Sequence, residues 1–208
     1  MRTTFAITLL SVLGMWSAFA SDDPVKDYLS LPVSYLRNPG YYSTDQVFRI
    51  DLDLRHNGET VTLVTFNRDR DGQQGNIWVV YRKTPEGYKS IGTMTFDTSF
   101  LHLGWIHQMH AYGAATIGHA GGEQGSIDAY VDEGESIREK SISGVHHFWY
   151  LKRMGSPFAR YFENSLPKLK QKIQVIDAKQ LAEKYGLHIE KESYEEAGMN
   201  GFKGIPTK

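Results

Sequence analysis

The sequence predicts an α+β fold, with an antiparallel β meander or sandwich over about residues 47–151 and short C-terminal helices after it. Two observations favour this fold. Runs of β-branched and aromatic residues recur between turn-forming dipeptides over residues 47–151. Beyond residue 151 these runs stop, and signals for helix starts take their place. A sheet that helices cover on one face or at one end fits this order of elements.

The first expected strand covers residues 47–54, where apolar and mostly polar side chains alternate. Such alternation predicts a half-buried strand with its polar face toward solvent. Asn57-Gly58 follows, and this dipeptide suits the positive φ angles of a two-residue type I′ hairpin turn. A turn centred there places Leu54 opposite Val61, so that apolar residues of both strands meet on one face.

Further strand segments follow the hairpin, separated by turn-forming residues. Pro85 and Gly87 stand at the second and fourth positions of a turn between two of these segments. The glycine-rich stretch 118–125 is expected to form a mobile hairpin loop. The expected strands share a high content of β-branched and aromatic residues and cover residues 76–82, 88–96, 101–117, 126–131 and 141–151.

Short helices are expected at three places. A helical or irregular segment over residues 22–31 precedes the strands, and a second helix begins near Pro157, a residue suited to the first helical position. The clearest helix start is Asp177, because its side chain can cap the helix and Gln180 stands three residues later. Gly186 is expected to end this helix.

The first 20 residues predict a secretory signal peptide. Arg2 supplies the positive charge, residues 5–16 the apolar run, and Ala18 and Ala20 the small residues before the cleavage point. We therefore expect an exported protein, located in a bacterial periplasm or secreted. No later run is long enough for a transmembrane helix, so the mature protein is expected to be soluble, without a transmembrane segment.

Cleavage would leave residues 21–208, enough chain to bury a core although the sequence has no cysteine for disulfides. We expect one β-rich domain over residues 21–190 and a loosely ordered C-terminal tail over residues 191–208. The formal net charge of −1 becomes −2 without Arg2, the one charged residue of the leader. This balance argues against nucleic acid as a partner.

The first candidate metal site is the stretch 67–72, in which oxygen-bearing side chains alternate before a glycine. Asn67, Asp69 and Asp71 would supply the ligands of a calcium ion. An EF-hand requires a glutamate at the twelfth position, whereas the twelfth residue counted from Asn67 is Trp78. The stretch therefore predicts either a calcium-stabilised structural or binding domain, or a polar turn between strands.

A second candidate is the region His102–His119, which holds four of the eight histidines. His107 and His110 share a face if the chain is bent or helical between them, and with His119 they could then bind zinc or a similar metal. Histidines packed among aromatic residues are the alternative. The competing functional hypothesis is therefore a metal-dependent hydrolase that uses some of His107, His110, His119, Glu123 and Asp128.

The sequence carries no catalytic signature for a nucleophile or a phosphate-binding loop, so no catalytic residue is assigned and the protein is expected not to be an enzyme. The leading hypothesis is a non-catalytic periplasmic binding or protein-interaction protein, such as an inhibitor or immunity-like partner of another envelope protein. No cofactor is expected unless calcium or zinc binds at the two candidate sites. Aromatic residues make up 12% of the chain, and any that are exposed would suit carbohydrate or protein recognition.

Overall fold

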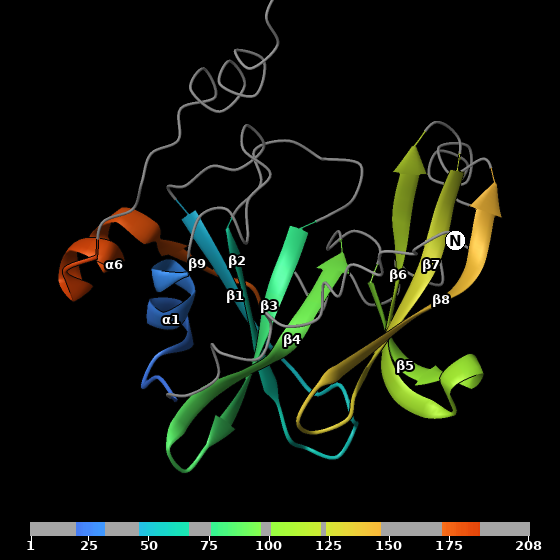
Figure 1. Ribbon diagram of the computed structural model, residues 1–208, viewed down its shortest axis with the longest axis horizontal. Helices are drawn as coiled ribbons and strands as arrows, with labels where there is room; N and C mark the ends of the chain where they lie inside the picture. Colours follow the sequence, from blue (N-terminus) through green and yellow to red (C-terminus); the bar gives the residue numbers. More distant parts are fainter. Residues whose placement is uncertain are drawn as a thin grey trace, which may run out of the picture.

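The computed structural model describes residues 20–31, 46–66, 76–96, 101–121, 124–146 and 172–187. Within these ranges the chain forms two antiparallel sheets and two α-helices (Figure 1). None of the described helices is long and apolar enough to span a membrane. The α+β fold class predicted from the sequence is confirmed.

The first sheet has the strand order β4-β3-β2-β1-β9. Its first four strands form a meander, as predicted, and the short strand β9 pairs with the outer edge of β1. The sequence pattern did not predict β9, because a strand of four residues has too few positions for a period to be visible. The strands are Gln46–Leu52 (β1), Val61–Phe66 (β2), Asn76–Thr84 (β3), Gly87–Phe96 (β4) and Gln174–Asp177 (β9).

The second sheet has the strand order β5-β6-β7-β8, with every neighbouring pair antiparallel. Its strands are Leu101–Ile106 (β5), Ala111–Gly121 (β6), Gln124–Asp132 (β7) and Ile137–His146 (β8). The glycine-rich stretch expected to be a loop is mostly strand, because β6 continues to Gly121 and β7 begins at Gln124.

Residues 101–117, predicted as one strand, are instead a hairpin. The 3-10 turn η2 (His107–Met109) separates β5 from β6, and His110 follows it in the left-handed conformation with φ of 50°. This turn reverses the chain, so that Trp105 pairs with Tyr112. The single strand is therefore wrong, whereas the alternative of a bent or helical segment within residues 104–110 is confirmed. No glycine, proline or asparagine marks the reversal, which uses a histidine at positive φ instead.

The main core lies between the two sheets. Trp78 and Met94 reach it from the first sheet, and Ala114 and Tyr130 from the second, all at most 1% exposed. Trp78 stacks on Phe96 with ring centroids 5.0 Å apart. Burial of each large side chain stabilises the fold by roughly 1.5–3 kcal/mol. This apolar layer therefore contributes most of the free energy that holds the two sheets together.

The helices α1 (Pro24–Ser30) and α6 (Ala178–Tyr185) cover the outer face of the five-stranded sheet (Figure 1). Tyr28 of α1 is buried there, and its hydroxyl accepts a hydrogen bond from the backbone N–H of Phe66 at 3.0 Å. Val47 of β1 is fully buried on the same face. Val47 was predicted to face solvent, and this prediction is wrong. Arg49 and Asp51, predicted on the same face, have side chains that are 24% and 40% exposed.

Both helix starts are capped by aspartate. The Asp23 carboxylate accepts a hydrogen bond from the N–H of Val25 at 2.8 Å, and that of Asp177 accepts one from Gln180 at 3.0 Å. Gly186 ends α6 with φ of 64°. The helix predicted from Asp177 to Gly186 is confirmed, as is a helical segment within residues 22–31.

The register of the first hairpin differs from the prediction by two residues. Leu52, not Leu54, lies opposite Val61, because residues 53–60 form a wider loop than a two-residue turn. The Asp53 carboxylate holds this loop by accepting hydrogen bonds from the N–H groups of Asn57 at 3.2 Å and Gly58 at 2.9 Å. The same side chains still face the core, because an even shift does not exchange the two faces of a strand.

Several predicted segments lie outside the described residues. They are the signal peptide up to residue 19, the helix expected near Pro157, the end of the last predicted strand at residues 147–151, and the tail at residues 191–208.

Gly113 of β6 has no room for a side chain, since a Cβ built on it would stand 2.2 Å from the carbonyl oxygen of Tyr130 in β7. We expect Gly113→Ala to lower the free energy of unfolding by about 1–3 kcal/mol, because a strand must move to admit the methyl group. Urea unfolding of the purified variant measures this. Gly104→Ala is the matched control, since Gly104 is the partner of Gly113 across β5 and β6 and its Cβ would meet only the side chain of His102. Equal losses in the two variants would contradict the packing argument.

Candidate binding site

The candidate site is built on the loop of residues 53–60, which reaches from the first sheet to the second. Asp53 organises the loop: slight burial acts to raise its pKa, but hydrogen bonds from the backbone N–H groups of Gly58, Asn57 and His56 outweigh burial and lower the pKa. The loop backbone is also unusual at His56, where φ is 55°, a conformation uncommon for residues other than glycine. The residues on either side must therefore hold the loop in place.

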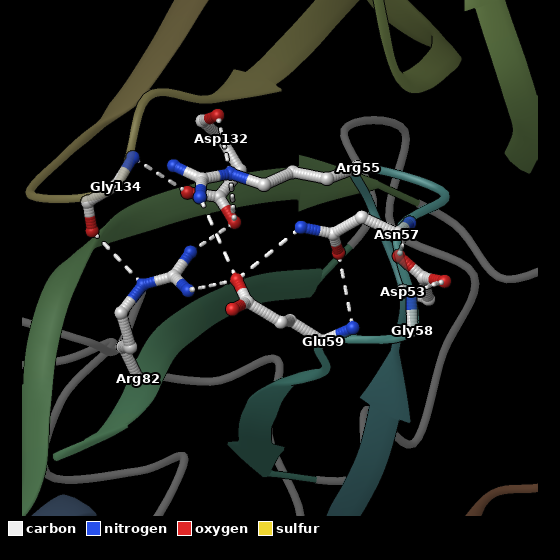
Figure 2. Close-up of polar contacts among 8 residues, drawn as sticks. All are labelled: Asp53, Arg55, Asn57, Gly58, Glu59, Arg82, Asp132 and Gly134. Atoms are coloured by element: carbon white, nitrogen blue, oxygen red, sulfur yellow. Dashed lines mark hydrogen bonds and ion pairs between the residues drawn. The ribbon is translucent and has the colours of Figure 1, made fainter.

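Arg55 anchors the loop to the second sheet through Asp132 at the end of β7 (Figure 2). Its Nε donates to the backbone carbonyl of Asp132 at 3.2 Å and lies 3.4 Å from the Asp132 carboxylate. Arg82 of β3 donates to the same carboxylate, and its Nε donates to the carbonyl of Gly134 at 2.9 Å. The Asp132 side chain is 3% exposed, so two guanidinium groups compensate one buried negative charge.

Glu59 joins the same network from the far end of the loop (Figure 2). Its carboxylate lies 3.7 Å from a guanidinium nitrogen of Arg55 and 3.7 Å from one of Arg82, and accepts a hydrogen bond from the Asn57 amide at 3.3 Å. We call Arg55, Glu59, Arg82 and Asp132 the inter-sheet clamp. Figure 1 shows the β1–β2 loop beside the β7–β8 turn at the end of the molecule where this clamp lies.

His56, the neighbour of Arg55, reaches the second sheet at a different point. Its ring stacks on Tyr112 with centroids 4.8 Å apart and an interplanar angle of 20°. Trp105, directly opposite Tyr112 in the β5–β6 hairpin, makes an edge-to-face contact with Tyr112 at 5.2 Å. We call His56, Trp105 and Tyr112 the aromatic cluster.

The aromatic cluster faces solvent. Trp105 and Tyr112 are 42% and 44% exposed, and His56 is also exposed. Among the described residues, the exposed large apolar side chains are these two and Val175 of β9. Rings fixed by mutual contact and left open to solvent provide a rigid surface that can bind a ligand with little loss of side-chain entropy.

The histidines predicted as zinc ligands are placed as follows. His107 begins η2 and His110 follows it, so the chain is bent between them, and both side chains are exposed. His119 lies in β6 opposite Gly125, but its side chain is outside the described part of the structure. In the ranges that the structure describes, no three His, Asp or Glu side chains are grouped to hold a metal ion. Zinc binding stays a prediction.

Of the remaining predicted site residues, the structure describes Asp128 alone. Asn67, Asp69 and Asp71, the proposed calcium ligands, lie outside the described residues, as does Glu123. Asp128 lies in β7, where its carboxylate accepts a hydrogen bond from the hydroxyl of Ser126 at 2.7 Å.

Sequence reasoning did not identify the residues that form the site. A hairpin centred on residues 108–109 pairs Trp105 with Tyr112, but the bend considered within residues 104–110 was not extended to a full reversal of the chain. Arg55 and Asp132 are 77 positions apart, and no local pattern connects them. For His56, the sequence indicated only that the residue lies beside the Asn57-Gly58 turn.

Comparison with family models, with curated proteins and with solved structures finds no match to this chain. The function must therefore be inferred from the geometry of the chain itself.

Asp132→Asn tests the inter-sheet clamp. The substitution keeps the size of the side chain but removes the charge that Arg55 and Arg82 share, so we expect the free energy of unfolding to fall by about 2–4 kcal/mol. Thermal and urea unfolding measure this loss.

Glu135→Gln is the control for this experiment, because Glu135 also links the β7–β8 turn to the first sheet through an ion pair with Lys89 at 2.9 Å. The Glu135 side chain is 86% exposed, so its substitution should leave the melting temperature unchanged. A loss in Asp132→Asn no larger than that in Glu135→Gln would show that the buried charge does not hold the sheets together.

Proposed function

We propose that this chain is an exported, non-catalytic binding protein of the cell envelope, and that the aromatic cluster is its recognition surface. The observation that carries the proposal is the pair of exposed rings, Trp105 and Tyr112, held against His56 at a junction of the two sheets. Tyrosine and tryptophan provide large contact areas and anchor many binding sites.

The rigidity of the aromatic cluster supports this proposal. Backbone pairing fixes Trp105 opposite Tyr112, and the clamp through Arg55 fixes the loop that carries His56. A site assembled before the ligand arrives loses less conformational entropy on binding than a mobile one. The cluster therefore has the properties of a preformed binding surface.

The sequence of the leader supports export, and the pairing of Ser21 is compatible with cleavage directly before it. The N–H of Ser21 donates to the carbonyl of Tyr88 at 3.0 Å, and the N–H of Tyr88 donates to the carbonyl of Ser21 at 2.7 Å. A chain cleaved after Ala20 keeps both contacts, because a terminal ammonium at Ser21 can still donate. Cleavage at the predicted point would thus retain the pairing of Ser21 with Tyr88.

We expect N-terminal sequencing of the protein from the periplasmic or secreted fraction to begin at Ser21. Ala20→Lys should block processing, because signal peptidases require a small residue before the cut. Ser21→Ala is the matched control, since it leaves the small residues intact and should be processed. Recovery of the unprocessed chain from the cytoplasm would contradict export.

Retention of envelope material tests the recognition surface. Immobilised mature protein should bind components of a fraction that contains cell wall and membranes, and Trp105→Ala should reduce the retained material several-fold. Val175→Ala is the control, because it removes an exposed apolar side chain on β9, at the opposite edge of the first sheet from β4. Equal retention by the wild type and both variants would rule out the aromatic cluster as the binding surface.

A further inference from the structure

We infer that the aromatic cluster binds a neutral glycan chain, with a sugar ring stacked on Trp105. This inference rests on the proposed function and names the class of ligand for the same surface. Two properties lead to it: the exposed rings of the cluster, and the pairing of the charged residues of the neighbouring loop with other groups of the protein.

The shape and polarity of the aromatic cluster suit a sugar ring. A pyranose ring presents an apolar face of C–H groups, which complements the negative face of an aromatic ring. Trp105 is 42% exposed, and its orientation is fixed by the edge-to-face contact with Tyr112. Tyr112 is itself fixed by the stack with His56. The cluster therefore offers a sugar ring a surface that does not have to reorganise.

The charged residues near the aromatic cluster disfavour an anionic ligand. Residues 105–112 contain no Lys, Arg, Asp or Glu. In the loop of residues 53–60, Asp53 is bound by backbone N–H groups, Arg55 by Asp132, and Glu59 by guanidinium groups. Because these charges already have partners within the protein, a phosphate or carboxylate would find no free cation in either segment.

The polar groups beside Trp105 also fit a neutral ligand. His107, Gln108 and His110 are exposed at the tip of the β5–β6 hairpin, directly beyond the paired residues Trp105 and Tyr112. Amide and imidazole groups both donate and accept hydrogen bonds, as sugar hydroxyls require. The surface thus combines a stacking ring with neutral polar side chains.

A protein partner fits these observations less well. Stable protein interfaces cover about 800 Å² on each partner, and their strongest contacts use arginine together with tryptophan and tyrosine. Here the exposed rings form one small group, and Arg55 and Arg82 are bound within the inter-sheet clamp. A narrow chain that contacts a few rings matches the surface better than a broad interface does.

Calorimetry and tryptophan fluorescence of the mature full chain test this inference. The probes are cellohexaose and chitohexaose, which are neutral, and hexagalacturonate, which is anionic. We expect saturable binding of at least one neutral hexamer that does not change when the salt concentration is raised from about 0.05 to 0.5 M. Trp105→Ala should weaken this binding at least tenfold, and His56→Ala by a smaller factor because it acts through Tyr112.

Val175→Ala is the matched control and should bind within twofold of the wild type. Circular dichroism and melting curves must first show that each variant is folded. Tighter binding of hexagalacturonate, with a strong dependence on salt, would overturn the assignment of a neutral ligand.

Absence of Trp105-dependent binding to both neutral hexamers would overturn the glycan inference. If retention of envelope material still depended on Trp105, the proposed function would stand with a protein as the ligand. If that retention failed as well, both proposals would fall.

Discussion

The architecture of the site depends on one buried charge, the carboxylate of Asp132. Removing a carboxylate from water costs several kcal/mol unless its partners are well placed. Arg82 belongs to strand β3 of the first sheet and Arg55 to the loop between its strands β1 and β2, and both reach Asp132 in the second sheet, so the charge is compensated only while the sheets stay together. The apolar layer between the sheets supplies most of the cohesion, and Asp132 fixes their relative position at one end.

The same anchor positions the aromatic cluster. Arg55 and His56 are adjacent, and each makes its contact on a different part of the second sheet. A left-handed conformation at His56 persists because the contacts on both sides of it leave no other path for the loop. The contacts that join the sheets are therefore also the contacts that hold Trp105 and Tyr112 open to solvent in a fixed arrangement. Structural stability and the proposed recognition surface share one loop.

Pairing within the clamp also determines the electrostatic character of the surface. Arginine and glutamate beside an exposed aromatic cluster would ordinarily attract charged ligands. In this chain Arg55 and Glu59 are paired with charges of the inter-sheet clamp, which leaves aromatic rings, imidazoles and an amide for contact with a ligand. The neutral recognition surface is thus a consequence of the way in which the two sheets are joined.

The fold class, most strands of the two meanders and the capped helix that begins at Asp177 could be predicted from sequence, because strand periods and caps depend on residues close together in the chain. The faces of the first hairpin also followed from alternation, although its register did not. Tertiary structure alone decided β9, the reversal at His110 and the meeting of Arg55 with Asp132 across 77 positions. These features depend on which distant surfaces pack together, and no local pattern records that choice.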